Sequence, residues 1–145
     1  MMKNLFQILC GLFLVVSYSS CMHSEEDKVD VLIIGGGASG VTSGIQSARM
    51  GANTLILEES TWLGGMLTSA GVSAVDGNYR LPAGLWGEFK NRLSDYYGGL
   101  DSLKTGWVSN VLFEPSVGNK ILHEMVAAEN NLKVWKQACL EEGKR

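Results

Sequence analysis

The sequence predicts an α/β fold built on a parallel sheet, and three observations predict it. A strand is expected at residues 29–34, in which residues 31–34 form a continuous apolar run, a glycine-rich turn follows, and apolar residues then recur at helical spacing from residue 38 onward. Strands that are buried on both faces of a parallel sheet read as continuous apolar runs. A second strand, expected at residues 53–58 around the apolar residues 55–57, completes a strand–helix–strand unit, whose strands we expect to lie parallel in one sheet.

The glycine-rich turn joins the first expected strand to the first expected helix, with the pattern Gly35-x-Gly37-x-x-Gly40. We expect Gly35 to permit the tight turn, Gly37 to let the backbone approach a phosphate, and Gly40 to let the helix pack closely. Such a turn points backbone N–H groups and the positive end of a helix dipole at a pyrophosphate, as in a Rossmann-like dinucleotide site. A glycine-rich turn of another α/β domain is the alternative.

The helix and strand after the turn supply the rest of the expected dinucleotide site. The helix is expected over residues 38–50, and Gly51 lies where a helix-ending glycine belongs. The following strand ends in Glu58, about 20 residues beyond Gly35, where an acidic residue of such sites accepts hydrogen bonds from ribose hydroxyls.

Two further helices and a third strand are expected after a long irregular stretch. Apolar residues recur at helical spacing over residues 83–97 and 117–131. We expect Ser116, which follows Pro115, to cap the later helix. Residues 132–136 then indicate a third strand, parallel to the first two. The apolar stripe of the earlier helix, expected in the core, consists of Leu85, Trp86, Phe89, Leu93 and Tyr96.

A glycine doublet after Glu58 indicates which dinucleotide is bound. Gly64-Gly65 is not part of a minimal NAD fingerprint, and adjacent glycines allow the backbone to lie close against a cofactor. With the glycine-rich turn and the acidic residue in register, the sequence resembles the FAD-dependent oxidoreductases that have a glutathione-reductase-type FAD-binding domain. Residues 65–72 and 81–87 resemble a subgroup of bacterial members, many of them exported.

The resemblance implies FAD as the cofactor and gives roles to nine residues. The turn would contact the pyrophosphate, the acidic residue would bind the adenosine ribose, and the doublet and its neighbour would lie toward the flavin. The nine residues are Gly35, Gly37, Ala38, Ser39, Gly40, Glu58, Gly64, Gly65 and Met66. In disulfide reductases of this fold a redox-active cysteine pair follows the doublet, whereas residues 66–71 here contain no cysteine. Electron transfer is therefore expected only between flavin and substrate.

Other residues offer no competing site. His123 is interpreted as a surface or half-buried helical residue, Asp76 as part of a turn, and the four tryptophans as core or interface residues. The cysteines show no metal-binding spacing, so no metal is expected. The net charge of −3 and the pI near 5.3 argue against a nucleic-acid partner. A small-molecule substrate is expected, and no residue identifies it.

The first 28 residues are expected to lie outside the fold. Residues 1–20 resemble a bacterial lipoprotein signal, because an apolar run too short to span a bilayer precedes small residues and Cys21. Lipidation of Cys21 would anchor the protein to a membrane of the bacterial cell envelope, with residues 21–28 as a tether. A secretory signal cut nearby, leaving a secreted or periplasmic protein, is the alternative.

Residues 29–145 are expected to form only part of an FAD-binding domain. Members of the family that the chain resembles run to several hundred residues and need further strands and a substrate domain. We therefore expect an N-terminal fragment that binds the ADP half of FAD and is inactive by itself. An NAD(P)-binding oxidoreductase and a non-catalytic, membrane-tethered interaction protein remain as alternatives.

Overall fold

The structure is a computed structural model that describes residues 28–107 and 109–139. The expected signal segment, Cys21 and most of the tether lie outside the described residues. The elements follow in the expected order: β1 (Val31–Ile34), α2 (Ala38–Arg49), β2 (Thr54–Glu58), α3 (Gly84–Tyr97), α4 (Pro115–Ala127) and β3 (Leu132–Lys136), with short 3₁₀ helices at Gly65–Leu67 and Leu100–Leu103.

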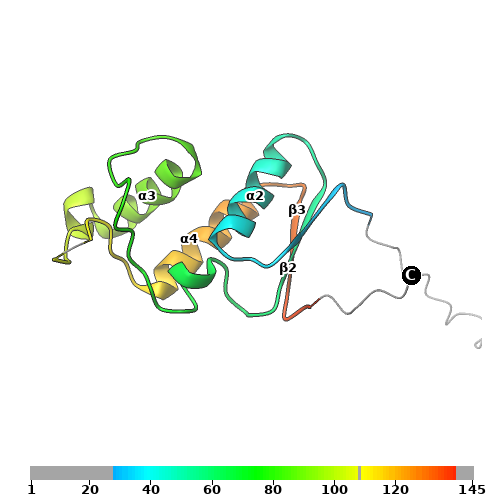
Figure 1. The fold of residues 1–145 in the computed structure, drawn as a ribbon. Coiled ribbons are helices and arrows are strands. Elements are labelled where there is room, and N and C mark those ends of the chain that lie inside the picture. Colours follow the sequence, from blue (N-terminus) through cyan, green and yellow to red (C-terminus); the bar gives the residue numbers. More distant parts are fainter. Residues whose placement is uncertain (1–27, 108, 140–145) are drawn as a thin grey trace, which may run out of the picture.

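The three strands form one parallel sheet in the order β1-β2-β3, which confirms the expected Rossmann-like α/β fold. Ile33, Ile56 and Val134 are register partners across the sheet. Helix α2 packs against all three strands, and α4 lies beside α2 and against β3 (Figure 1). The approach of α2 is close because a Cβ at Gly44 would lie 2.7 Å from Ile56 Cδ1.

The opposite face of the sheet is exposed at its two outer strands, β1 and β3, whereas Leu55 and Leu57 of the central strand β2 are buried. Leu32 and Ile34 of β1 are 48% and 57% exposed, and Trp135 of β3 is 46% exposed. Among the described residues, β1 pairs only with β2, so its other edge has no strand beside it. Because apolar side chains lie on both faces of β1, its sequence is a continuous apolar run, although helices cover only one of the two faces.

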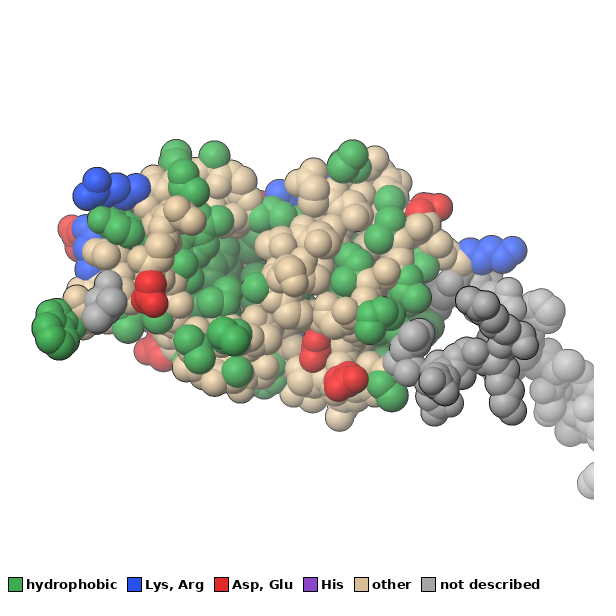
Figure 2. All heavy atoms as spheres, in the orientation of Figure 1, with side chains coloured by type: hydrophobic (Ala, Val, Ile, Leu, Met, Phe, Trp, Pro, Cys, Tyr) green, Lys and Arg blue, Asp and Glu red, His purple; other side chains and the backbone are tan. Residues whose placement is uncertain are grey.

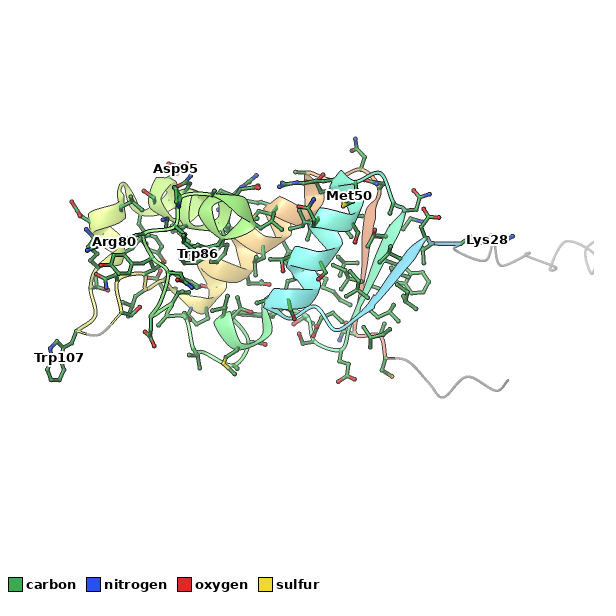
Figure 3. All side chains as sticks on the ribbon, turned by 45° about the horizontal axis from the view of Figure 1, so that its top comes forward. Lys28, Met50, Arg80, Trp86, Asp95 and Trp107 are labelled. Carbon is green, nitrogen blue, oxygen red and sulfur yellow. The ribbon has the colours of Figure 1, made fainter. Side chains whose placement is uncertain are left out.

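The core lies between the sheet, α2, α4 and α3. It contains the expected apolar faces of α2 and α4 together with part of α3. Phe89 and Leu93 of α3 are buried, whereas Tyr96 is 52% exposed, so its expected place in the core stripe is wrong. Trp107 is fully exposed at the far end of the molecule from Lys28 (Figure 3), which excludes a core role for it.

Helix α4 begins and ends earlier than the sequence predicts. Pro115 is its first residue and Glu114 its N-cap, so Ser116 is inside the helix and does not cap it. Proline suits this place because its φ is already helical and its missing N–H would have no partner there. The chain leaves the helix after Ala127, and the Asn131 carbonyl then accepts a hydrogen bond from Thr54 N–H at the start of β2.

Among the described residues, no helix is both long enough and apolar enough to cross a membrane.

Candidate functional site

The glycine-rich turn lies at the carboxyl end of β1 and leads directly into α2. Gly35 has a φ of +95°, which a residue with a side chain rarely adopts, and its N–H donates to the Leu57 carbonyl at 2.8 Å. Gly37 is the N-cap of α2, and no side chain accepts a hydrogen bond from the first turn of this helix. The start of α2 therefore presents backbone donors and the positive end of its dipole.

The glycines of the turn differ in how closely other atoms approach them. A Cβ at Gly37 would meet nothing within 4 Å, so the space in front of this residue is open. A Cβ at Gly40 would collide with the Gly35 carbonyl, which explains how α2 starts so close to the turn. Gly36 is also crowded, because its Cβ would lie 2.8 Å from Leu63 Cδ2 and 2.9 Å from Glu58 Oε2. Sequence reasoning gave Gly36 no role, although a third consecutive glycine was a visible signal.

Glu58 connects the end of β2 to the glycine-rich turn. Its Oε2 accepts a hydrogen bond from Gly36 N–H at 2.6 Å, and its Oε1 accepts one from Ser60 N–H at 2.8 Å. Burial alone would raise the pKa of Glu58, but the Ser60 side chain and the N–H groups of Ser60 and Gly36 lower the pKa below its usual value. The carboxylate is thus held ionised and fixed in direction, with lone pairs left for a ligand.

The glycine doublet lies against the turn. Gly64 N–H donates to the Gly36 carbonyl at 2.8 Å, and Gly37 and Gly64 form an isolated parallel bridge. Gly64 has a φ of +106° and Gly65 a φ of +54°, both in the left-handed region. A Cβ at Gly65 would lie 3.1 Å from Gly37 Cα. The two glycine motifs, far apart in sequence, therefore form one layer of exposed backbone.

Asn119 of α4 supports this layer, and sequence reasoning missed it. Its Oδ1 accepts a hydrogen bond from Leu63 N–H at 2.9 Å, immediately before the doublet. The Leu63 side chain is fully buried, so the segment is fixed on both sides. An asparagine within an apolar helical stripe was the available signal, because a polar residue there needs a partner.

Two cavities border the glycine-rich turn and the start of α2, one at Gly35 and the other at Ala38. The smaller, about 180 Å³, is lined by Gly35, Glu58 and Cys139 with their neighbours. The larger, about 590 Å³, is lined by Ala38 and Met66 together with mostly apolar residues: Leu67, Val72, Ala74, Val75, Gly77, Asn78, Leu81 and Trp86. Figure 2 shows a hollow with hydrophobic side chains between the part that carries α3 and the part that carries α2. The turn thus joins a cavity beside a carboxylate to an apolar cavity.

The structure brings all nine sequence-predicted residues to this region. Ala38 and Ser39 are exposed in the first turn of α2, and Met66 is 68% exposed at the mouth of the larger cavity. His123 does not belong to the site, because it is half-buried on α4 and neither cavity includes it. Within residues 28–107 and 109–139, no group of three or more His, Cys, Asp or Glu side chains could hold a metal ion.

A comparison with known families decides the assignment. The model of the family described as FAD dependent oxidoreductase matches residues 30–144, most of the chain. This chain belongs to that family. FAD is accordingly its cofactor, in agreement with the sequence-based expectation. A search of curated proteins found no match.

Three solved structures to which this chain is similar are each about twice as long as this chain or longer. Histamine dehydrogenase from Rhizobium sp. 4-9 is 15% identical with a TM-score of 0.41, and the alignment covers 83% of this chain and 13% of that one. THI4 from Thermovibrio ammonificans is 18% identical with a TM-score of 0.43, over 90% and 45%. p-Nitrophenol 4-monooxygenase PnpA from Pseudomonas putida DLL-E4 is 16% identical with a TM-score of 0.43, over 79% and 33%. The chain therefore spans less than half the length of these proteins.

The residues at the turn fit the family's cofactor. The open space before Gly37 leaves room for a phosphate group, and the uncapped first turn of α2 supplies N–H donors to it. Glu58 is ionised and fixed beside the smaller cavity, which suits two ribose hydroxyls. The apolar lining of the larger cavity suits an aromatic ring.

Proposed function

We propose that this chain forms the nucleotide-binding part of a flavin-dependent oxidoreductase with a glutathione-reductase-type FAD-binding domain. One observation carries the proposal. The Gly36 backbone bonds to Glu58 on one side and to Gly64 on the other, beside the uncapped start of α2. A ribose site, a pyrophosphate site and a glycine surface toward the flavin therefore occur in the order in which FAD would need them.

Each part of the cofactor has a proposed place. The adenosine lies in the smaller cavity with its ribose on Glu58, and the pyrophosphate lies before Gly37, where α2 starts. The flavin end is directed past Gly65 and Met66 toward the larger cavity. When bound, FAD supplies the electron transfer that the chain's own side chains cannot perform.

The chain's own residues bind and orient the cofactor but supply little chemistry at the flavin end. None of the side chains that line the larger cavity titrates, so the described part of the chain offers no general acid or base there. We therefore expect binding of FAD without turnover by this chain alone. A small-molecule substrate would be positioned by residues outside those described.

Nucleotide titration tests the proposal. The protein from residue 21 to residue 145 is titrated by calorimetry with FAD, ADP, FMN and NAD⁺. We expect FAD and ADP to bind, FMN to bind much more weakly because it lacks the ADP half, and FAD to displace NAD⁺. Binding of NAD⁺ in preference to FAD would favour the nicotinamide alternative. A folded chain that binds no nucleotide would overturn the proposal and favour a non-catalytic interaction protein.

We also propose that the protein is exported and anchored through lipid on Cys21, or, if the signal is cut differently, released into the periplasm or secreted. The support is the apolar run and the small residues before Cys21, which lie outside the described residues. Full-length protein expressed in a Gram-negative bacterium is labelled with a clickable palmitate and fractionated. Cys21→Ser should lose label and membrane association, whereas Cys139→Ser should keep both. Equal labelling of the Cys21→Ser variant would refute lipidation at this residue.

A further inference from the structure

A third cavity, of about 600 Å³, lies away from the glycine-rich turn and is lined by cationic side chains. Arg80, Lys90 and Lys104 contribute to its wall, and no lining residue is acidic. The remaining lining residues are Tyr79, Pro82, Asn91, Leu100, Asn110 and Val111. Arg80 lies at the end of the molecule opposite Lys28 (Figure 3). The cavity therefore combines three positive charges with neutral polar groups.

Lys90 is the unusual member of this set because its charge is buried. The residue is 6% exposed, and its Nζ donates to the carbonyls of Tyr79 and Leu81 at 2.7 and 2.8 Å. Its third contact is the ring of Trp86, at 6.0 Å from the centroid. In the part of the chain that the structure describes, no carboxylate lies within ion-pair distance of Lys90. A buried ammonium without an anion is unfavourable, since carbonyl dipoles replace only part of its lost hydration.

Arg80 adds a second charge without an anionic partner. Its Nε donates to the Tyr79 hydroxyl at 3.1 Å, and its guanidinium lies over the Tyr79 ring at 5.4 Å. It forms no salt bridge with any described residue. Lys104 is different, because Asp101 pairs with it at 2.8 Å. Arg80 is exposed, and among the described residues only its Nε–H donates a hydrogen bond, so the other N–H groups of the guanidinium can bind a carboxylate or phosphate.

We propose that this cavity binds a small anion that carries a carboxylate or phosphate group, held between Arg80 and Lys90. The site is separate from the proposed FAD site and does not depend on it. The segment from residue 78 to residue 82 separates the two regions, since Asn78 and Leu81 line the apolar cavity whereas Tyr79, Arg80 and Pro82 line this one. An anion bound here would balance the charge of Lys90 and stabilise this shared wall.

Calorimetric titration of the full chain with malonate and with inorganic phosphate tests the site, and the two probes distinguish carboxylate from phosphate ligands. We expect saturable binding of at least one probe. Arg80→Gln should weaken it about tenfold, the effect of losing one charge-assisted hydrogen bond. Lys120→Gln, which removes an exposed lysine of α4 that lies outside this cavity, should leave affinity within about twofold.

Two further variants make the result decisive. Gly37→Val should leave anion affinity unchanged, which would place the binding away from the glycine-rich turn. Lys90→Met should weaken binding further, and if it fails to fold, Arg80→Gln still decides. The proposal is overturned if neither probe binds saturably up to about 10 mM. It is equally overturned if Gly37→Val abolishes binding while Arg80→Gln does not, because the anion would then occupy the FAD site.

Discussion

Glu58 Oε2 accepts a hydrogen bond from Gly36 N–H at 2.6 Å, and this contact joins the end of β2 to the glycine-rich turn. It fixes a carboxylate beside one cavity and, through the same glycine, orients the backbone at the start of α2. Because Gly36 also accepts from Gly64 N–H, the contact connects both glycine motifs. The proposed cofactor site therefore depends on one short chain of hydrogen bonds.

Removing the charge of Glu58 should weaken both the site and the fold. Glu58→Gln keeps the shape of the side chain but places an amide donor beside one of two backbone N–H groups. We expect the free energy of unfolding to fall by about 1–2 kcal/mol, as for the loss of hydrogen bonds to a charged group. FAD affinity should fall about tenfold or more, since the ribose loses its anionic acceptor. Chemical denaturation and calorimetry measure the two effects.

Glu124→Gln is the matched control for this change. Glu124 is exposed on α4, lines neither cavity of the proposed site, and forms only a 3.9 Å ion pair with Lys120. It should change neither stability nor FAD affinity by more than about 0.5 kcal/mol. Equal losses in both variants would argue against a specific role for Glu58.

Substitutions at Gly37 and Gly40 should have different effects, the first on FAD affinity and the second on the free energy of unfolding. Gly37→Val places its side chain in open space and at an ordinary φ of −63°, so the fold should survive while FAD binding is lost. Gly40→Ala should instead destabilise the protein by about 1–3 kcal/mol, because its Cβ would collide with the Gly35 carbonyl. Circular dichroism during heating and FAD titration measure both variants. Unchanged FAD affinity in a folded Gly37→Val variant would contradict the proposed position of the pyrophosphate.

Asn119 should support the Gly64-Gly65 doublet indirectly, through its hydrogen bond to Leu63 N–H. Asn119→Leu removes the acceptor of Leu63 N–H, and an unpaired, partly buried donor costs about 1–2 kcal/mol. FAD affinity should also fall, because the segment before Gly64 loses its anchor on α4. Asn130→Leu, an exposed change just after α4, serves as the control. Loss of stability with unchanged FAD affinity would show that Asn119 supports the fold alone.

Acidification should destabilise the protein in two steps. Burial, and to a lesser extent Lys136, lowers the pKa of His123 below its ordinary value of 6.5, and hydrogen bonds lower that of Glu58 below 4.5. Both groups therefore bind protons less readily when folded than when unfolded, so the free energy of unfolding falls as the pH drops. The loss at His123 starts near its unfolded pKa of about 6.5, and that at Glu58 follows at lower pH.

Denaturation curves between pH 7.5 and 3.5 test this order, because this range extends about one unit above the ordinary pKa of His123 and about one unit below that of Glu58. His123→Gln should flatten the first part of the curve and Glu58→Gln the second. A His123→Gln variant that keeps the full loss between about pH 7 and 5 would show that other groups cause it.

Much of the fold follows from local sequence patterns. The strand at residues 132–136 has the expected bounds, and α2 and α3 differ from their expected ranges by a residue at an end. These elements have strong periodicity and clear boundary residues, such as Gly51. Helix α4 begins earlier than expected because Pro115 occupies its first position. It ends at Ala127, and residues 128–131 instead lead to β3, where the Asn131 carbonyl accepts a hydrogen bond from Thr54 N–H, a partner distant in sequence.

Burial was harder to predict than secondary structure. Tyr96 has the spacing of a core residue but lies on the outer side of α3, and Trp107 is fully exposed. Lys90, by contrast, is buried although its residue type is usually exposed. Side-chain spacing identifies a helical face, but the neighbouring elements determine how wide a stripe of that face they cover.

The sequence by itself determined the strand–turn–helix unit, the spacing of Glu58 from the turn, and hence the class of cofactor. These features are local, because glycine conformation and apolar periodicity act within a few residues. Only the tertiary structure decided that Gly36 bonds to both Glu58 and Gly64, that Asn119 holds the doublet, and that Arg80 and Lys90 line one cavity. Each of these relationships joins residues from different elements, whose distances are fixed only when the helices pack on the sheet.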